Sequence, residues 1–247
     1  MTQMSSGMSR KWILVPGTLC SGQVFAPLLD ELGVEQNACR IIVPDAPDVR
    51  DYTDRLREAV TGGEIVCGFS LGALILAHNL AALKHAHSDV LLASNPCADP
   101  PENRANRETL RDRLLAGGAR DWVTENWATM STSKREDLRN FVASMAEETV
   151  ELVAAQTELA ASRPGALDDL AETELPLIFV TGAEDQLTPP NLLSTVVDSA
   201  KHAQLHVIAD LGHFALIEAP GQVAKAIGRS LKDIAQHSQL ESRPHVT

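Results

Sequence analysis

The sequence predicts a doubly wound α/β fold, built on a mostly parallel sheet of about six strands, with helices inserted between two of the strands. Three observations lead to this fold class. Short runs rich in Ile and Val recur and mostly lack polar alternation, as strands do when a parallel sheet is covered on both faces. Helical patterns separate most of these runs, and such alternation is typical of doubly wound folds. One long interval without a strand interrupts the alternation.

The core elements follow one another in a regular order, and turn residues bound each apolar run. The runs expected to form strands are Trp12–Val15, Arg40–Val43, Ile65–Cys67, Val90–Ala93, Leu177–Val180 and Leu205–Ile208. The helical patterns between and after them cover Ser21–Leu32, Tyr52–Val60, Leu71–Leu83, Pro190–Ala200 and Pro220–Ala235.

The long interval lies between Pro96 and Pro176, where charged, Ala- and Leu-rich sequence contains no convincing strand. Its helical patterns cover Glu102–Ala116, Arg120–Met130, Lys134–Met145 and Glu147–Ser162. A crossover needs only about a dozen residues, so we interpret the interval as a helical lid, with ordinary crossover helices as the alternative. The expected organisation is a core of residues 11–96 and 176–236, a lid of residues 97–175, and flexible tails at residues 1–10 and 237–247.

The composition argues against several classes of partner. The chain of 247 residues carries a net charge of −12, whereas nucleic-acid binding needs clustered Lys and Arg. The same acidity argues against binding to anionic membranes, and the sequence lacks the long apolar stretch of a membrane span. We therefore expect a small-molecule substrate, no nucleic-acid partner and no membrane partner. The oligomeric state stays open, a homodimer included.

The cysteines indicate the redox environment. Cys20, Cys39, Cys67 and Cys97 are widely spaced and form no CxxC pair, which predicts neither a metal site nor a disulfide framework. We expect no metal and no cofactor. Residues 1–10 lack the apolar segment of a secretory signal peptide. The expected location is the reducing cytoplasm, with free thiols.

A motif of the form G-x-S-x-G follows the third predicted strand and precedes an apolar helix. Its residues are Gly68-Phe69-Ser70-Leu71-Gly72. A sharp strand-to-helix turn of this kind lifts the serine clear of the sheet, and the glycines leave room for the crossing chains. Ser70 is therefore the candidate nucleophile, with a helix-capping serine as the alternative.

Loops after the last two predicted strands supply a candidate base and two candidate acids. Glu184 and Asp185 follow the fifth strand, on the rim where α/β sheets bind ligands. Of the eight histidines, only His213 stands directly after a glycine on a loop that follows a strand. The order of serine, acid and histidine differs from the orders of chymotrypsin and subtilisin.

On these motifs the chain resembles the α/β-hydrolase superfamily, in its branch of small cofactor-free esterases and C–C hydrolases. The resemblance covers nearly all of residues 12–235, with the oxyanion loop, nucleophile, lid, acid and histidine in the family's order. It implies a triad of Ser70, His213 and Asp185, because the family's spacing of glycine, acid and proline selects Asp185 over Glu184. The family usually has two further strands before the first one here, so we expect about six.

The segment Val15-Pro16-Gly17-Thr18-Leu19 follows the first strand, where the family usually has His-Gly-X. Pro16 replaces the histidine, but the oxyanion donor is a main-chain N–H and remains available. The resemblance implies Thr18 and Leu71 as the two donors, with Leu19 as the alternative to Thr18. Each such donor typically stabilises the transition state by a few kcal/mol.

The lid predicts the character of the substrate. Between Asp99 and Glu174 there are 16 acidic and 9 basic residues, a difference of −7, which should repel polyanions. Bulky apolar lid residues, with two aromatic residues beside the triad, should face the cleft, unless they only hold lid to core. Those expected to contact substrate are Phe69, Trp122, Trp127, Met130 and Phe214. We expect a neutral, mostly apolar substrate of small to medium size and little activity on CoA thioesters.

The function implied by the resemblance is that of a serine hydrolase that cleaves a carboxylic ester through an acyl-enzyme. The same triad serves C–C hydrolases of β-diketones or vinylogous acids, and lactonases, so these alternatives stay open. A hydrolase-fold receptor with slow turnover is the alternative from another class. Gln156 and Arg163 resemble positions that recur in this branch, and we interpret them as fastening the lid to the core.

Overall fold

Parallel strands form a six-stranded sheet in the computed structural model, which describes residues 10–241. In chain order the strands are β1 (Trp12–Val15), β2 (Cys39–Ile41), β3 (Ile65–Phe69), β4 (Ser88–Leu92), β5 (Leu177–Gly182) and β6 (Ala203–Ile208). Their spatial order is β2-β1-β3-β4-β5-β6, and every neighbouring pair is parallel. The chain changes winding direction between β1 and β3, which is where α/β sheets bind ligands. The predicted fold class is confirmed.

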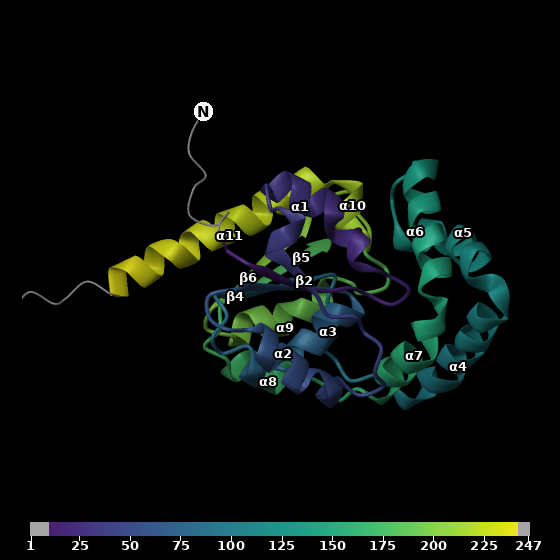
Figure 1. The fold of residues 1–247 in the computed structure, drawn as a ribbon, viewed down its shortest axis with the longest axis horizontal. Helices are drawn as coiled ribbons and strands as arrows, with labels where there is room; N and C mark the ends of the chain where they lie inside the picture. Colours follow the sequence, from purple (N-terminus) through teal and green to yellow (C-terminus); the bar gives the residue numbers. More distant parts are fainter. Residues whose placement is uncertain (1–9, 242–247) are drawn as a thin grey trace, which may run out of the picture.

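Helices cover both faces of the sheet (Figure 1). One face packs against α1 (Ala26–Leu32), α10 (Ala215–Glu218) and α11 (Pro220–Glu241), and the other against α2 (Thr53–Ala59), α3 (Leu71–Ala77), α8 (Leu167–Glu172) and α9 (Asn191–Ser199). Within β3, Cys67 and Phe69 pack into the first apolar cluster and Val66 into the second. Because both faces are covered, every residue of β3 is buried, which explains its unbroken apolar sequence.

Four helices between β4 and β5 stand to one side of the sheet (Figure 1). They are α4 (Arg104–Arg113), α5 (Ala119–Met130), α6 (Glu136–Glu148) and α7 (Val153–Ser162), and together they are called the helical insertion below. Within it, α4 contacts α7, and α5 contacts α6. The predicted helix Glu102–Ala116 is shorter in the structure, because α4 is preceded by a 3₁₀ turn and passes at Leu114 into a π-helical turn. Within that turn Gly117 has φ 97°, a left-handed conformation that glycine adopts without strain.

Two further helix predictions differ from the structure for local reasons. The helix expected from Glu147 begins later, because Thr149 ends α6 and donates its hydroxyl to the Met145 carbonyl over 2.9 Å. The short helix α8 has no counterpart in the sequence prediction, since six residues give too little periodicity to recognise. Its Leu170 is buried in the cluster between the sheet and α9, so α8 packs with the core.

The edges of the fold also depart from the prediction. The edge strand β2 is partly exposed, and α3 ends at Ala77, before a separate short turn of helix. In contrast, α11 continues to Glu241 and so includes the first residues of the predicted C-terminal tail. The rest of the two predicted tails, residues 1–9 and 242–247, lies outside the described residues. Among residues 10–241, no helix combines the length and apolar character that a membrane span needs.

Candidate active site

Ser70 stands at the junction of β3 and α3, in a strained backbone conformation with φ 52° and ψ −112°. The sharp turn requires the glycines on either side. A Cβ atom at Gly72 would lie 1.9 Å from the Val15 carbonyl oxygen, and one at Gly68 would lie 2.5 Å from the Ala73 nitrogen. Only glycine permits these approaches, so the sequence G-x-S-x-G dictates the position of the Ser70 hydroxyl.

His213 lies between Ser70 and Asp185 in a continuous chain of hydrogen bonds. Its Nδ1 is 2.9 Å from Asp185 Oδ2, and its Nε2 is 3.0 Å from Ser70 Oγ. Because the carboxylate accepts the Nδ1 proton, Nε2 is left free to accept the proton of the Ser70 hydroxyl. The backbone N–H of His213 donates to the Met130 carbonyl at the end of α5 over 2.9 Å, so the helical insertion helps to hold this loop.

Asp185 accepts hydrogen bonds from three further groups on its own loop. The backbone N–H groups of Leu187 and Thr188 each donate to Oδ1 over 2.9 Å, and the Thr188 hydroxyl donates to Oδ2 over 2.6 Å. Burial opposes ionisation, but the hydrogen bonds from His213 and Thr188 outweigh it and lower the pKa of the Asp185 carboxyl. The competing acid Glu184 is exposed, and the structure brings Asp185 to the histidine.

The loop after β1 lies close against Ser70. A Cβ atom at Gly17 would lie 3.1 Å from Ser70 Cβ, which shows how closely the two segments approach. Within residues 10–241, no hydrogen bond occupies the backbone N–H of Thr18 or of Leu71. The N–H of Leu19, in contrast, donates to Gln156 Oε1 over 3.1 Å. Of these two neighbouring N–H groups, only that of Thr18 is without a hydrogen bond among the described residues.

A cavity of about 330 Å³ opens above Ser70 and His213. Four of the residues expected to contact substrate, Phe69, Trp122, Met130 and Phe214, line it. Trp127 does not line the cavity. Its ring stacks on Phe214 with centroids 6.0 Å apart, and its Nε1 donates to the Ser133 carbonyl over 2.7 Å. Trp127 therefore supports the cavity wall from behind.

Comparison with known proteins agrees with this geometry. A model of the alpha/beta hydrolase family matches residues 12–226. The chain belongs to the α/β-hydrolase family.

Individual relatives of this α/β-hydrolase are distant. A pimeloyl-[acyl-carrier protein] methyl ester esterase from Stenotrophomonas maltophilia (strain K279a) is 24% identical over 245 residues, covering 90% of this chain and 93% of the relative. A thermophilic esterase from Thermogutta terrifontis (malate bound) superposes with a TM-score of 0.79 at 19% identity, covering 93% and 92% of the two chains. MenH from S. aureus superposes with a TM-score of 0.74 at 12% identity, covering 93% of this chain and 96% of MenH. The two structural matches show the shared fold.

The cavity of this α/β-hydrolase also has a polar side that the sequence analysis did not predict. Asn95, Arg107, Gln156 and Arg163 line it, although only Gln156 and Arg163 stood out in the sequence, as residues joining lid to core. The two arginines share one buried carboxylate, Asp99, at 2.6 Å from Arg107 and 3.1 Å from Arg163. Asp99 lies between β4 and α4, so no local sequence pattern links it to Arg163.

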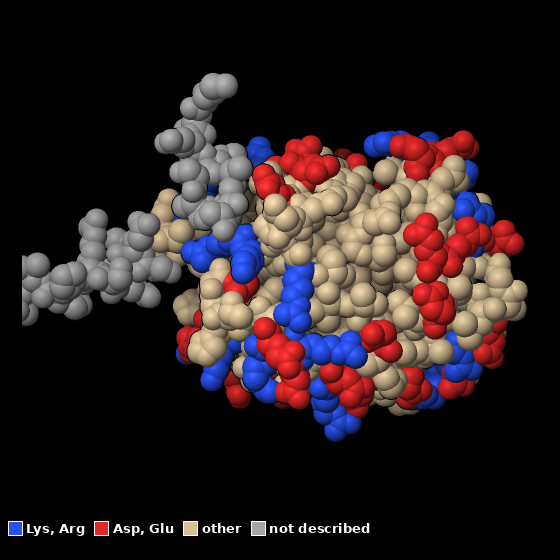
Figure 2. All heavy atoms as spheres, viewed as in Figure 1, with Lys and Arg blue, Asp and Glu red and all other residues tan. Residues whose placement is uncertain are grey.

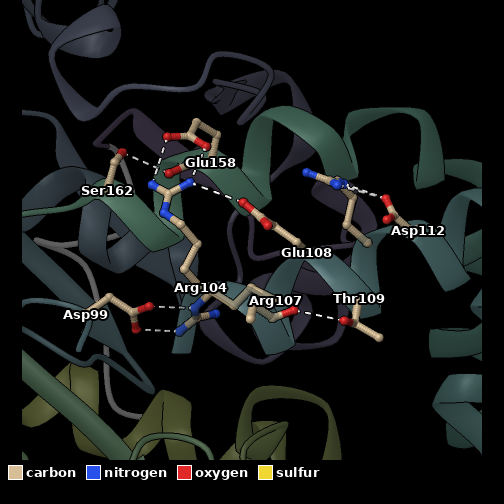
Figure 3. A network of polar contacts seen from close by, with 10 residues as sticks. Asp99, Arg104, Arg107, Glu108, Thr109, Asp112, Glu158 and Ser162 are labelled. Carbon is tan, nitrogen blue, oxygen red and sulfur yellow. Dashed lines mark hydrogen bonds and ion pairs between the residues drawn. The ribbon is translucent and has the colours of Figure 1, made fainter. Parts of the chain in front are cut away.

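The same ion-pair network ties α4 to α7 on the outside of the molecule. Figure 3 shows Arg104 of α4 paired with Glu158 of α7, beside the pairing of Arg107 with Asp99. Arg104 contacts both carboxylate oxygens of Glu158, at 2.9 and 3.1 Å. Charged contacts therefore join the first helix of the insertion, α4, to its last helix, α7.

Cys20 is the one cysteine among the residues that line the cavity. Burial raises the pKa of its thiol to about 12, although a hydrogen bond with Gly17 opposes the shift. A thiol with such a pKa stays protonated at neutral pH and is a poor nucleophile. Among the described residues, no group of three or more His, Cys, Asp or Glu side chains is arranged to hold a metal ion.

Proposed function

We propose that this α/β-hydrolase is a serine esterase that cleaves a carboxylic ester through an acyl-enzyme. One observation carries the proposal: Ser70, His213 and Asp185 form an uninterrupted hydrogen-bonded chain, of which Ser70 and His213 line a cavity. Each side chain has the partner that nucleophilic catalysis needs. The match to the family and the esterase names of its relatives support the same class of reaction.

The proposed reaction proceeds in two halves. His213 Nε2 accepts the Ser70 proton while Oγ attacks the ester carbonyl, and the ionised Asp185 stabilises the imidazolium that forms. The negative charge on the carbonyl oxygen is stabilised by the N–H groups of Thr18 and Leu71. His213 then donates its proton to the departing alcohol. In the second half, His213 takes a proton from the water that attacks the acyl-enzyme, and it returns this proton to Ser70 Oγ as the acid is released.

The cavity supports a small, mostly apolar substrate that is free in solution. Its volume of about 330 Å³ is at the small end of the usual range for small-molecule sites. The aromatic and aliphatic side chains of its lining favour an apolar acyl or alcohol group. We propose that the helical insertion acts as the lid of this cavity and that the chain works in the cytoplasm.

The outer surface argues against an acyl group delivered by an acidic carrier. Every arginine between residues 97 and 175 forms an ion pair with a carboxylate; these are Arg104, Arg107, Arg111, Arg113, Arg120, Arg135, Arg139 and Arg163. Figure 2 accordingly shows acidic and basic side chains intermixed over the insertion. Binding a phosphopantetheine arm or an acidic protein calls for a cluster of unpaired cations, whereas Lys134 is the one cation of this interval without an ion pair among the described residues. A free ester fits this surface better than a carrier-bound one.

A specific observation favours a second substrate class. Arg107 and Arg163 together balance only one carboxylate, Asp99, so this side of the cavity has one positive charge in excess. An ester with a carboxylate at its far end, such as the half-ester of a dicarboxylic acid, would find a partner there. Comparing kcat/KM for a neutral ester and a half-ester of equal length, at low and high salt, distinguishes the two classes. The neutral-ester proposal requires that the neutral compound is preferred.

The decisive test of the reaction uses p-nitrophenyl esters of graded chain length, beside a lactone and a β-diketone. We expect ester cleavage, and we expect Ser70→Ala to lose on the order of 10³-fold or more in kcat and all labelling by a fluorophosphonate. Labelling of Ser70→Ala at the wild-type rate would refute Ser70 as the nucleophile. Faster turnover of the lactone or the diketone would assign the same triad to a lactonase or a C–C hydrolase. Binding of ligands without turnover would indicate a receptor.

A further inference from the structure

Gln156 of α7 joins three segments of the chain inside the molecule. Its side-chain amide is almost fully buried, with 1% of the residue exposed. Oε1 accepts the backbone N–H of Leu19 over 3.1 Å, and Nε2 donates to the Pro44 carbonyl, beyond β2, over 3.2 Å. Only this orientation of the amide satisfies both contacts, because one partner is a donor and the other an acceptor. The helical insertion is thereby bonded to the loop that lies close against Ser70.

Leu19 has a backbone conformation that needs such support. Its φ of 56° lies in the left-handed region, which residues with a side chain rarely adopt and keep only when their surroundings hold them there. Inside the loop, the Cys20 N–H donates to the Gly17 carbonyl over 3.1 Å, and the Leu19 side chain is buried. From outside the loop, the Gln156 amide holds the Leu19 N–H.

The residue before Leu19 is the proposed oxyanion donor. The N–H groups of Thr18 and Leu19 belong to adjacent peptide units joined at the Thr18 Cα, so a displacement of the Leu19 peptide unit can be transmitted to the Thr18 N–H. Oxyanion stabilisation depends on donors that already point to where the charge develops, and a misplacement of about 1 Å can cost on the order of 10²-fold in rate. The Leu19–Gln156 hydrogen bond therefore lies one residue from a geometry-sensitive group.

We propose that Gln156 is a positioning residue for the oxyanion loop, which holds the Thr18 N–H in place by accepting the neighbouring Leu19 N–H. This inference rests on the proposed esterase function and deepens it. Gln156 acts through the loop, because its Oε1 accepts the Leu19 N–H while its Nε2 is bonded to Pro44. The helical insertion thus contributes to charge stabilisation as well as covering the cavity.

The test compares two variants of the same helix. Gln156→Met keeps the length of the side chain and removes both hydrogen bonds. We expect kcat to fall about 10- to 100-fold with KM changed by less than about twofold, because the ground state makes little use of the oxyanion donors. The affinity for a boronic acid, which forms a tetrahedral adduct on Ser70, should fall by the same factor as kcat/KM.

Glu158→Gln is the matched control. It lies two positions further along α7 and loses the exposed ion pair with Arg104, without touching the oxyanion loop. Its kcat and boronate affinity should equal those of the wild type. An unchanged kcat in Gln156→Met, or an equal loss of kcat in Glu158→Gln, would overturn the proposal. A wild-type protein without esterase activity would instead refute the proposed function.

A measurement on the wild-type chain keeps the proposal testable even where Gln156→Met folds poorly. With ¹⁵N-labelled Thr and Leu, the amide resonance of Thr18 should move when the boronate adduct forms, because its N–H gains an acceptor. The Leu19 resonance should stay, because its N–H remains bonded to Gln156. Movement of Leu19 with Thr18 unchanged would make Leu19 the donor and exclude the positioning role of Gln156.

Discussion

The sheet core and the helical insertion contribute in different ways to the site. Ser70, Asp185 and His213 all come from the core, on loops that follow β3, β5 and β6. The insertion supplies cavity walls and two links to these loops, through the Gln156 side chain and the Met130 carbonyl. The core therefore provides the proposed reacting groups, and the insertion surrounds and steadies them.

The two regions depend on apolar packing to different degrees. The helices α5, α6 and α7 bury apolar side chains in the first apolar cluster together with the core, but α4 does not. Every residue of α3, the helix behind Ser70, is buried, whereas none of the residues of α4 is buried. Across the insertion, exposed ion pairs such as Arg113–Glu125 and Arg120–Glu147 join the helices. Apolar burial stabilises far more than exposed ion pairs, which contribute about 0–1 kcal/mol each. The proposed reacting side chains thus lie on the tightly packed core. Much of the surface that would contact the substrate belongs to the less buried insertion.

The largest effect on kcat is expected for a substitution of Asp185 in the core. Asp185→Asn should lower kcat on the order of 10³-fold, because a neutral amide neither holds the His213 tautomer nor stabilises the imidazolium. Glu184→Gln is the control, since Glu184 is exposed and should tolerate the change. Steady-state kinetics on both variants measures the difference. If Glu184→Gln is the more damaging, the acid of the triad is Glu184.

The next effect concerns the stability of the core. Asp89 of β4 is fully buried, and neither of its carboxylate oxygens has a hydrogen-bond partner among the described residues. Burial raises the pKa of this carboxyl well above its ordinary value. The folded state thus keeps a proton that the unfolded state releases at lower pH. Stability is greatest below the unfolded pKa and is lost as pH rises toward the folded pKa.

Asp89→Asn should remove this pH dependence. Between the unfolded and folded pKa values, the wild-type protein should lose about 1.4 kcal/mol of unfolding free energy per pH unit, and the variant should not. Urea unfolding between about pH 4 and pH 8 measures the slope, with the exposed Asp54→Asn as control. Parallel slopes in the wild type and Asp89→Asn would show that Asp89 is not the group responsible.

A smaller effect on kcat is expected for Thr188, whose hydroxyl donates a hydrogen bond to Asp185. Thr188→Val removes the hydroxyl that donates to Asp185 Oδ2, while the two backbone N–H bonds to Oδ1 remain. Loss of one hydrogen bond to a charged group should lower kcat about tenfold. It should also raise the pKa of Asp185 toward its ordinary value, so activity is lost at a higher pH on acidification. A pH–rate profile that matches the wild type would contradict this role of Thr188.

The smallest effect, a change in the unfolding free energy, is expected for an exposed ion pair of the insertion. Arg113→Gln breaks the exposed ion pair with Glu125 between α4 and α5, and it should change the unfolding free energy by less than about 1 kcal/mol. Thermal or urea unfolding measures the change, and kcat serves as a second readout that should stay constant. A loss of several kcal/mol would mean that the insertion depends on its ion pairs as strongly as the core depends on burial.

The fold could be predicted from sequence because its signals are local. The glycines around Ser70 and the glycine before His213 mark turns whose geometry few other residues permit, and the apolar runs mark strands buried on both faces. The approach of Asp185 rather than Glu184 to His213 agrees with the family's spacing. Trp127, in contrast, was expected in the cavity and lies behind Phe214. Its position depends on how α5 is rotated, which periodicity does not specify.

The partners of Gln156 and Arg163, which were expected to fasten the insertion to the core, could not be predicted from the sequence for a physical reason. Gln156 and Leu19 are separated by 137 positions, and Arg163 and Asp99 meet only after the insertion has folded back onto the core. Nothing within a window of neighbouring residues distinguishes a glutamine that bonds a distant backbone from one that faces solvent. Resemblance singled out Gln156 and Arg163, and only the structure shows what they bind.

The contact between Gly72 and the Val15 carbonyl has a consequence for engineering. Any larger residue at Gly72 would force β1 and α3 apart, and with them the proposed oxyanion loop and Ser70. A mutagenesis library aimed at new substrates should therefore leave this crossing untouched and place its diversity on α4 and α5. Leu110, Trp122 and Val123 face the cavity from those helices. Selectivity could then be varied by directed evolution while the reactive machinery is inherited unchanged.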